Sequence, residues 1–285
     1  MLPVRDTELF VERFAGPFED EGKPTLVMVH GLTSSIALND KLRFPDWREL
    51  ASGYPLVRYD SRGHGKSKQD HLPESYNWEN LAEDLLSLCQ ALTLDDIVIG
   101  GSSMGAATCL HAVVKGLKVR GLVLAIPPSH GEDRSKIGRV YKKFSDILEA
   151  EGQRALTRHW SRLPQTEFLA REFPESRDIS YRDFEENTDS LSMVAAFRGA
   201  ALCRFPAVDK LKGISVPVLI LCREDDPTHP VESARYLAQV IGGSKLHIAT
   251  SADDVRQWPE LVRSFLDELE MNLDRNQCVE QKESF

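Results

Sequence analysis

The chain has 285 residues, of which 41% are hydrophobic and 28% are charged, a balance typical of soluble globular proteins. A chain of this length can bury a full core without disulfides or metals, so we expect one large α/β domain or one domain with an insertion. The formal net charge of −9 argues against nucleic acid and against anionic membrane surfaces as partners, and nothing in the composition indicates an oligomeric state.

Cysteine usage and the N-terminal segment both predict a cytoplasmic protein. The five cysteines form no Cys-x-x-Cys pair and no zinc-binding spacing, and an odd number without a framework is typical of a reducing compartment. Residues 1–5 lead into charged residues without the apolar core of a signal peptide. No apolar run reaches the roughly 18 residues that a membrane span requires.

Apolar runs of strand length alternate with helical patterns along most of the chain, which predicts a doubly wound, mostly parallel sheet. Uninterrupted apolar runs are typical of parallel strands that are buried on both faces. The expected strands cover 9–14, 25–29, 55–60, 97–100, 120–126, 216–221 and 245–249, and the main helices are expected over 78–92, 104–114, 231–241 and 259–270.

The alternation stops between 129 and 205, where charged residues and helix formers dominate and no strand-like run occurs. We expect several short helices there, including 136–150 and 190–203, that form a lid over the strand ends. The predicted organisation is an α/β core over 1–128 and 206–271, a helical cap over 129–205, and a frayed polar tail over 272–285.

A strand leads into Gly101-Ser102-Ser103-Met104-Gly105, and a helix-compatible segment follows. Strand, sharp turn and helix in this order form a nucleophile elbow, in which the central serine hydroxyl stands exposed above the sheet. Small residues two positions before and after the serine prevent clashes in the strained turn, and Gly101 and Gly105 occupy those positions. The pattern therefore predicts Ser103 as a nucleophile, above a helix N-terminus that offers positive potential to an oxyanion.

Several motifs in this order resemble the α/β-hydrolase family, in the subgroup with a helical cap inserted after the sixth core strand. They are His30-Gly31 after a strand, Asp60-x-Arg62-Gly63-His64-Gly65-x-Ser67, the elbow, and an acidic turn after 216–221. The resemblance covers roughly residues 8–270. It implies an acyl-Ser103 intermediate, oxyanion donors at the backbone N–H groups of Leu32 and Met104, and no cofactor or metal. It also implies that His30 and His64 are structural.

The resemblance places the acid of a catalytic triad in the acidic turn, at Asp225 or Asp226. In the family pattern the acid follows a small strand-ending residue by three positions, and counting from Cys222 gives Asp225. Asp226, which precedes a proline, is the alternative by one register. Two aspartates at the carboxyl end of a sheet strand favour a functional role over ordinary loop composition.

The family's base is a histidine in the turn after the last strand, but residues 250–255 contain none. Serine needs a base to act as a nucleophile, so another histidine has to serve if this chemistry is kept. His229 lies in the acidic turn and is the preferred candidate, its alternative being a surface histidine that caps the next helix. His130, at the entry to the cap, is a second candidate and a predicted substrate-pocket residue, whereas His247 and His111 are expected to be structural.

The motifs together favour a serine hydrolase that cleaves an ester, thioester or lactone of a small apolar molecule. If no histidine acts as base, the chain is a catalytically silent binding protein, or a lyase or isomerase that uses Ser103 with another proton carrier. Aromatic residues of the cap supply surface for the core or for an apolar pocket, and they are Tyr141, Phe144, Trp160, Phe168, Tyr181, Phe184 and Phe197.

Overall fold

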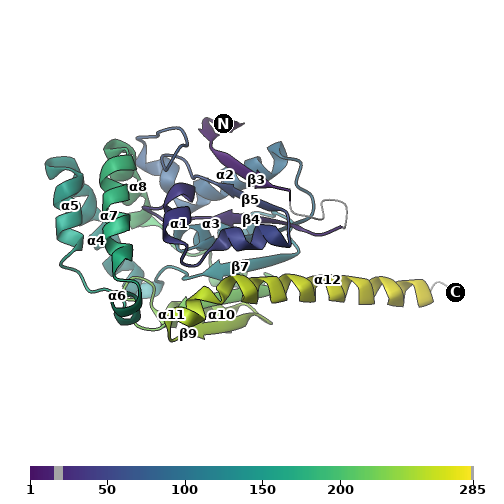
Figure 1. The fold of residues 1–285 in the computed structure, drawn as a ribbon. Coiled ribbons are helices and arrows are strands. Elements are labelled where there is room, and N and C mark those ends of the chain that lie inside the picture. The colour runs from purple at the N-terminus through teal and green to yellow at the C-terminus, as the bar shows by residue number, and fades with distance from the viewer. Residues whose placement is uncertain (16–21, 284–285) are drawn as a thin grey trace.

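A central sheet of seven strands organises the part of the chain that the computed structural model describes, residues 1–15 and 22–283 without the side chains of Phe168 and 272–283. The strands are β3 (Val11–Phe14), β4 (Thr25–Val29), β5 (Leu56–Tyr59), β6 (Ile97–Ser102), β7 (Gly121–Ala125), β8 (Val218–Arg223) and β9 (Lys245–Ala249). Their order is β3-β5-β4-β6-β7-β8-β9, and only β3 is antiparallel to its neighbour among these strands (Figure 1). This confirms the predicted doubly wound, mostly parallel sheet. A hairpin of β1 (Leu2–Val4) and β2 (Thr7–Leu9) precedes it.

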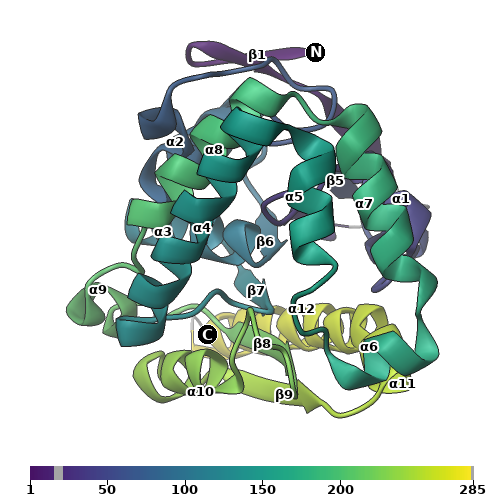
Figure 2. The same cartoon turned by 90° about the vertical axis from the view of Figure 1, so that its left-hand side faces the viewer.

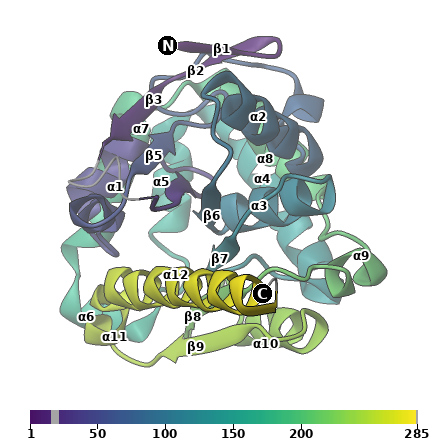
Figure 3. The same cartoon turned by 90° about the vertical axis from the view of Figure 1, so that its right-hand side faces the viewer.

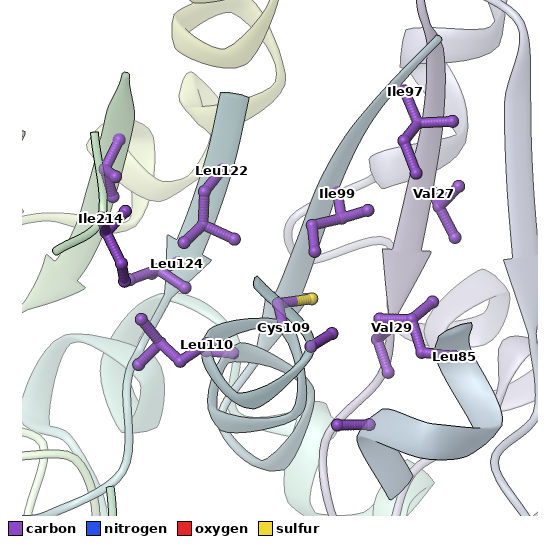
Figure 4. Packing of buried hydrophobic residues seen from close by; sticks show 14 of the residues in the cluster. Val27, Val29, Leu85, Ile97, Ile99, Cys109, Leu110, Leu122, Leu124 and Ile214 are labelled. Carbon is purple, nitrogen blue, oxygen red and sulfur yellow. The ribbon is translucent and has the colours of Figure 1, made fainter. Parts of the chain in front are cut away.

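Helices cover both faces of the sheet (Figure 3). One face packs against α2 (Trp78–Ala91), α3 (Met104–Val114) and α10 (Val231–Val240), and the other against η1 (Trp47–Ser52), α11 (Ala252–Arg256) and α12 (Trp258–Glu283). Successive side chains of a strand point to opposite faces, so Val27 and Val29 of β4 enter the first layer, which Figure 4 shows, whereas Leu26 and Met28 enter the second. Burial on both faces explains why the strand sequences are continuously apolar.

Between β7 and β8 the chain forms five successive helices that lie beside one another over one end of the sheet (Figure 2). They are α4 (Gly131–Glu151), α5 (Gln153–Trp160), α6 (Glu167–Glu172), α7 (Glu175–Asn187) and α8 (Ser190–Leu202). Four of them, α4, α5, α7 and α8, share an apolar cluster built around Phe144, Leu156, Phe184 and Phe197, separate from the two layers on the sheet. They fall within 129–205, the stretch for which a cap is predicted, and α9 (Val208–Lys212) leads back to the sheet.

The C-terminal helix α12 continues well beyond the closing helix expected from the sequence (Figure 1). We expected residues 272–285 to form a frayed tail, but the backbone stays helical through Glu283. Residues 271–283 contain no Gly or Pro and are rich in helix-favouring Glu, Gln, Arg and Lys, so no residue there ends the helix. None of the helices in 1–15 and 22–283, α12 included, has the length and apolar character to cross a membrane.

A buried ion cluster fixes the loop that follows β5. The guanidinium of Arg62 is 2% exposed and donates from Nε and Nη2 to the two carboxylate oxygens of Asp84 on α2, at 2.6 and 2.7 Å. It also donates to Asp70 at 2.8 Å and to Asp6 at 2.9 Å. Asp60 at the start of the loop accepts the first N–H of α1 (Ile36–Leu42) at 2.7 Å. The loop therefore ties three distant segments of the core together, as its resemblance to a structural signature implies.

Replacement of Arg62 by Met should lower the free energy of unfolding by about 3–5 kcal/mol, because it leaves the buried carboxylate of Asp84 without its bidentate partner. Urea unfolding followed by circular dichroism measures this change. Arg158→Met, at an exposed arginine of α5, is the matched control and should change the free energy by less than about 0.5 kcal/mol. A small effect of Arg62→Met would show that the cluster does not stabilise the fold.

Candidate active site

Ser103 occupies the sharp turn between β6 and α3, with φ 53° and ψ −112°. A residue with a side chain rarely adopts this conformation, which costs about 1–3 kcal/mol. The turn is tight: a Cβ on Gly101 would lie 2.4 Å from the carbonyl carbon of Gly105, and a Cβ on Gly105 would lie 2.2 Å from the backbone oxygen of Val29. Only glycine fits at these two positions, so the structure has the geometry of the predicted elbow.

His229 lies against Ser103, although the two residues are 126 positions apart in the chain. The distance from His229 Nε2 to Ser103 Oγ is 2.8 Å, and the distance from His229 Nδ1 to Asp226 Oδ2 is 3.0 Å. A carboxylate accepts but does not donate, so the neutral imidazole carries its proton on Nδ1 and presents a free Nε2 to the serine hydroxyl. Serine, histidine and aspartate therefore form one continuous chain of hydrogen bonds.

The carboxylate of Asp226 is buried and held from several sides. Arg223, at the end of β8, donates to Oδ2 from Nε at 2.7 Å and from Nη2 at 2.6 Å. The backbone N–H groups of Thr228 and His229 donate to Oδ1 at 2.9 and 3.1 Å. Burial alone would raise the pKa of Asp226. The favourable interactions of its carboxylate with His229 and Arg223, together with these hydrogen bonds, outweigh burial and hold the pKa well below its ordinary value. Asp226 is therefore an anion at any pH near neutrality.

The structure places Asp226, and not Asp225, against His229. Asp225 has a positive φ of 54°, and its side chain is exposed. This left-handed residue turns the chain, so the next carboxylate faces inward. The count of three residues from Cys222 selects Asp225, whereas the carboxylate that contacts His229 is that of the alternative from the sequence, Asp226. The role of the acid stays a prediction.

The other candidate histidines lie elsewhere. The ring of His130 stacks on Tyr236 with the centroids 4.1 Å apart, and its Nδ1 lies 3.3 Å from Ser233 Oγ, so it does not line the cavity beside Ser103. His111 Nε2 lies 2.9 Å from the backbone oxygen of Arg204, and His247 lies within β9. Within 1–15 and 22–283, no group of three or more His, Cys, Asp and Glu side chains could hold a metal ion.

The loop after β4 passes close to Ser103. A Cβ on Gly31 would lie 3.5 Å from the Cβ of Ser103, and Leu32 lines the cavity in front of it. The ring of His30 holds this loop, because its Nδ1 donates to the Gly31 carbonyl at 2.7 Å and its Nε2 accepts the N–H of Ser61 at 2.9 Å. Burial lowers the pKa of His30 to about 4, so the ring is neutral, as this hydrogen-bonding pattern requires. His30 and the equally buried His64 are thus in structural positions.

The oxyanion donors expected from the sequence are backbone groups of Leu32 and Met104. Met104 is the first residue of α3, and the first N–H groups of a helix have no partner within it. The N–H of Ser103 is already used, since it donates to the carbonyl of Ala125 at 3.0 Å. The roles of Leu32 and Met104 stay predictions.

A cavity of about 620 Å³ opens in front of Ser103 and His229, between the sheet ends and the helices α4, α5, α7 and α8. Its lining is mainly apolar, with Leu38, Leu42, Trp47 and Trp258 on the core side. The aromatic residues predicted for the cap gather on the opposite wall, at Tyr141, Phe144, Trp160, Tyr181, Phe184 and Phe197, and the side chain of Phe168 lies outside what the structure describes. The volume and lining suit a small molecule with apolar parts.

A family model described as the alpha/beta hydrolase fold matches residues 24–256, and the chain belongs to this family. This membership confirms the fold and the class of enzyme, a hydrolase, that the sequence motifs predict.

Curated relatives and solved structures support the assignment. The chain is 23% identical over 268 residues to 3-oxoadipate enol-lactonase 1 of Acinetobacter baylyi, covering 93% of this chain and 94% of that one. It is 25% identical to a non-heme chloroperoxidase of Kitasatospora aureofaciens, over 87% and 90% of the two chains. The structure of a thermophilic esterase from Thermogutta terrifontis superimposes with a TM-score of 0.75 at 22% identity, over 94% and 97%, which shows a shared fold.

Sequence reasoning missed two features of this site. Arg223 was not singled out, although its spacing of three residues before Asp226 at a strand end is the signal that could have found it. The turn after β9, where the family resemblance places the base, instead begins α11 with a capping box of Ser251 and Asp254. The sequence pattern Ser-x-x-Asp predicts this capping box.

Asp226→Asn should lower the free energy of unfolding at pH 7 by about 3 kcal/mol, because it leaves the Arg223 guanidinium without its anion. The pKa of Asp226 is lower in the folded than in the unfolded state, so its stabilisation is complete above the unfolded pKa of about 4 and is lost as the pH falls toward the folded value. The difference in unfolding free energy between wild type and Asp226→Asn should therefore persist down to about pH 5 and narrow below about pH 4, as urea unfolding at each pH would measure.

Asp225→Asn removes the neighbouring, exposed carboxylate and provides the matched control. The unfolding free energy of Asp225→Asn should equal that of the wild type at every pH. A gap for Asp226→Asn that stayed constant down to about pH 3 would contradict the ionic account of this contact.

Proposed function

We propose that this protein is a serine hydrolase that cleaves an ester, thioester or lactone of a small molecule through an acyl-Ser103 intermediate. The observation that carries the proposal is the contact of 2.8 Å between His229 Nε2 and Ser103 Oγ, with Nδ1 of the same ring on Asp226. In this proposal His229 acts as the base and Asp226 as the acid of the triad. The enol-lactonase and esterase among the relatives and neighbours support ester bonds as the target.

In the proposed reaction, Ser103 Oγ attacks the substrate carbonyl while its proton passes to His229 Nε2. Asp226 holds the ring through Nδ1 and stabilises the imidazolium that forms. The proton then goes to the leaving alkoxide or thiolate. A water molecule, deprotonated by the same nitrogen, attacks the acyl-enzyme and releases the acid and free Ser103. Base and acid come from one turn instead of two.

Negative charge on the carbonyl oxygen needs donors on the side of the elbow. We assign this part to the backbone N–H groups of Leu32 and Met104, supported by the position of Met104 at the N-terminus of α3. One such donor contributes about 3 kcal/mol to the transition state. The absence of a histidine after β9 is the main argument for a catalytically silent protein. His229 answers this argument, because its ring nitrogen lies at hydrogen-bonding distance from Ser103.

Fluorophosphonate labelling, read by intact mass, tests the nucleophile and the base together. We expect rapid labelling of the wild type, none of Ser103→Ala, and a rate at least about 100-fold lower for His229→Ala, because general-base assistance contributes about 10²–10⁴-fold. His130→Ala, which changes a histidine outside the cavity, should label like the wild type. Unchanged labelling of His229→Ala would sink the proposed base, and no labelling of the wild type would sink the serine hydrolase.

The choice between the two aspartates has its own test. Asp226→Asn should reduce kcat for a 4-nitrophenyl ester by roughly 10³–10⁴-fold, because the amide no longer fixes the tautomer or stabilises the imidazolium. Asp225→Asn should stay within about twofold of the wild type. Steady-state hydrolysis at pH 7 measures both variants, and equal losses in the two would reject Asp226 as the specific partner.

A further inference from the structure

The lining of the cavity has an unusual charge balance. The protein carries 44 acidic and 35 basic residues, yet among the residues that the structure describes the lining contains no Asp, Glu or Lys and has two arginines, Arg177 and Arg223. The charge of Arg223 is compensated by Asp226, whose carboxylate lies 2.6 Å from its Nη2. Of these two arginines, Arg177 is the one whose positive charge has no carboxylate beside it among the described residues, and it makes the electrostatic potential of the cavity positive.

Arg177 belongs to the face of α7 that forms the cavity wall. Arg177, Tyr181 and Phe184 follow one another at spacings of four and three, which places them on one side of a helix. The guanidinium lies over the ring of Tyr181, 6.0 Å from its centroid, and the side chain is half-buried. It is thus displayed on the wall that faces the elbow, among aromatic residues.

The guanidinium is held in place but not neutralised. Nη2 donates to the carbonyl of Leu163 at 2.8 Å, and Nη1 donates to that of Ser161 at 3.4 Å. A guanidinium has five N–H donors in a rigid fork, so these two bonds orient the group and leave others free. Within the described residues Arg177 has no ion pair with a carboxylate.

Arg177 is partly exposed and has no carboxylate partner among the described residues, so its remaining N–H donors are open to a ligand. The fork of arginine matches the two oxygens of a carboxylate. We propose that the natural substrate carries a carboxylate in addition to its scissile ester or lactone bond, and that Arg177 binds this carboxylate while Ser103 attacks the carbonyl. This inference rests on the proposed function and adds the substrate class: half-esters of dicarboxylic acids, or lactones that bear a carboxylate. Arg177 is the specificity-determining residue.

Paired substrates test the inference. Mono-4-nitrophenyl esters of dicarboxylic acids of four to eight carbons are each compared with the 4-nitrophenyl ester of the monocarboxylic acid of equal length. For the wild type we expect kcat/KM to be at least about tenfold higher for the charged member at one or more lengths. Arg177→Met should abolish this preference, chiefly through KM, and leave the neutral esters within about threefold. A merely structural role of Arg177 would lower both members of each pair alike.

Arg182→Met is the matched control, because it removes the same charge from an exposed position of the same helix. It should keep the preference for the charged ester. Hydrolysis of neutral esters by a wild type with no such preference at any length would overturn the inference and leave the proposed function standing.

A binding measurement separates the inference from catalysis. The dicarboxylic half-esters are titrated calorimetrically into Ser103→Ala, which cannot form an acyl-enzyme. Binding that weakens at least about tenfold in Ser103→Ala with Arg177→Met, but not in Ser103→Ala with Arg182→Met, supports the carboxylate site even if the proposed reaction fails. Equal affinity for charged and neutral esters in Ser103→Ala overturns it.

Discussion

The hydrogen bond between His229 and Ser103 depends on the parallel arrangement of β6, β7 and β8. Ser103 follows β6 and His229 lies in the turn after β8, with β7 between the two strands. Because neighbouring strands are parallel, the turns that follow them meet at one edge of the sheet, where ligands of open α/β sheets bind. The elbow lifts the serine above this edge, and the turn from Asp226 onward brings the imidazole across to it. The cavity and the helices over it are arranged around this single contact.

Asp226 and His229, the acid and base of the proposed function, lie in one turn, and contacts within that turn hold them together. Pro227 and Pro230 restrict its backbone, and Asp226 accepts two N–H groups of the turn through one oxygen. The other oxygen lies between the imidazole and the guanidinium of Arg223. Both carboxylate oxygens therefore accept hydrogen bonds despite their burial. These bonds stabilise the anion, which explains why a buried carboxylate has a lowered pKa.

Much of this could be predicted from the sequence, because the signals are local. Continuous apolar runs locate the buried strands, and the elbow depends on two glycines that no other residue can replace. His229 could be selected because it lies in a turn at the correct edge of the sheet. Which of the two aspartates faces His229 could not be predicted, because the choice depends on the left-handed backbone of Asp225. An aspartate can adopt that conformation but does not require it. The exposure of Arg177 to the cavity depends on how α7 packs over the sheet, which no local pattern encodes.

The segment from Arg223 to His229 contains the guanidinium clamp, the carboxylate and the imidazole in seven consecutive residues. In the usual layout of the family, two separate loops must keep their relative positions for acid and base to meet. Here the distance between Asp226 and His229 is set by hydrogen bonds within one turn. It therefore does not depend on the position of a second loop. Under the proposed function the loop after β9 contributes no group to the reaction, and its residues instead cap the start of α11.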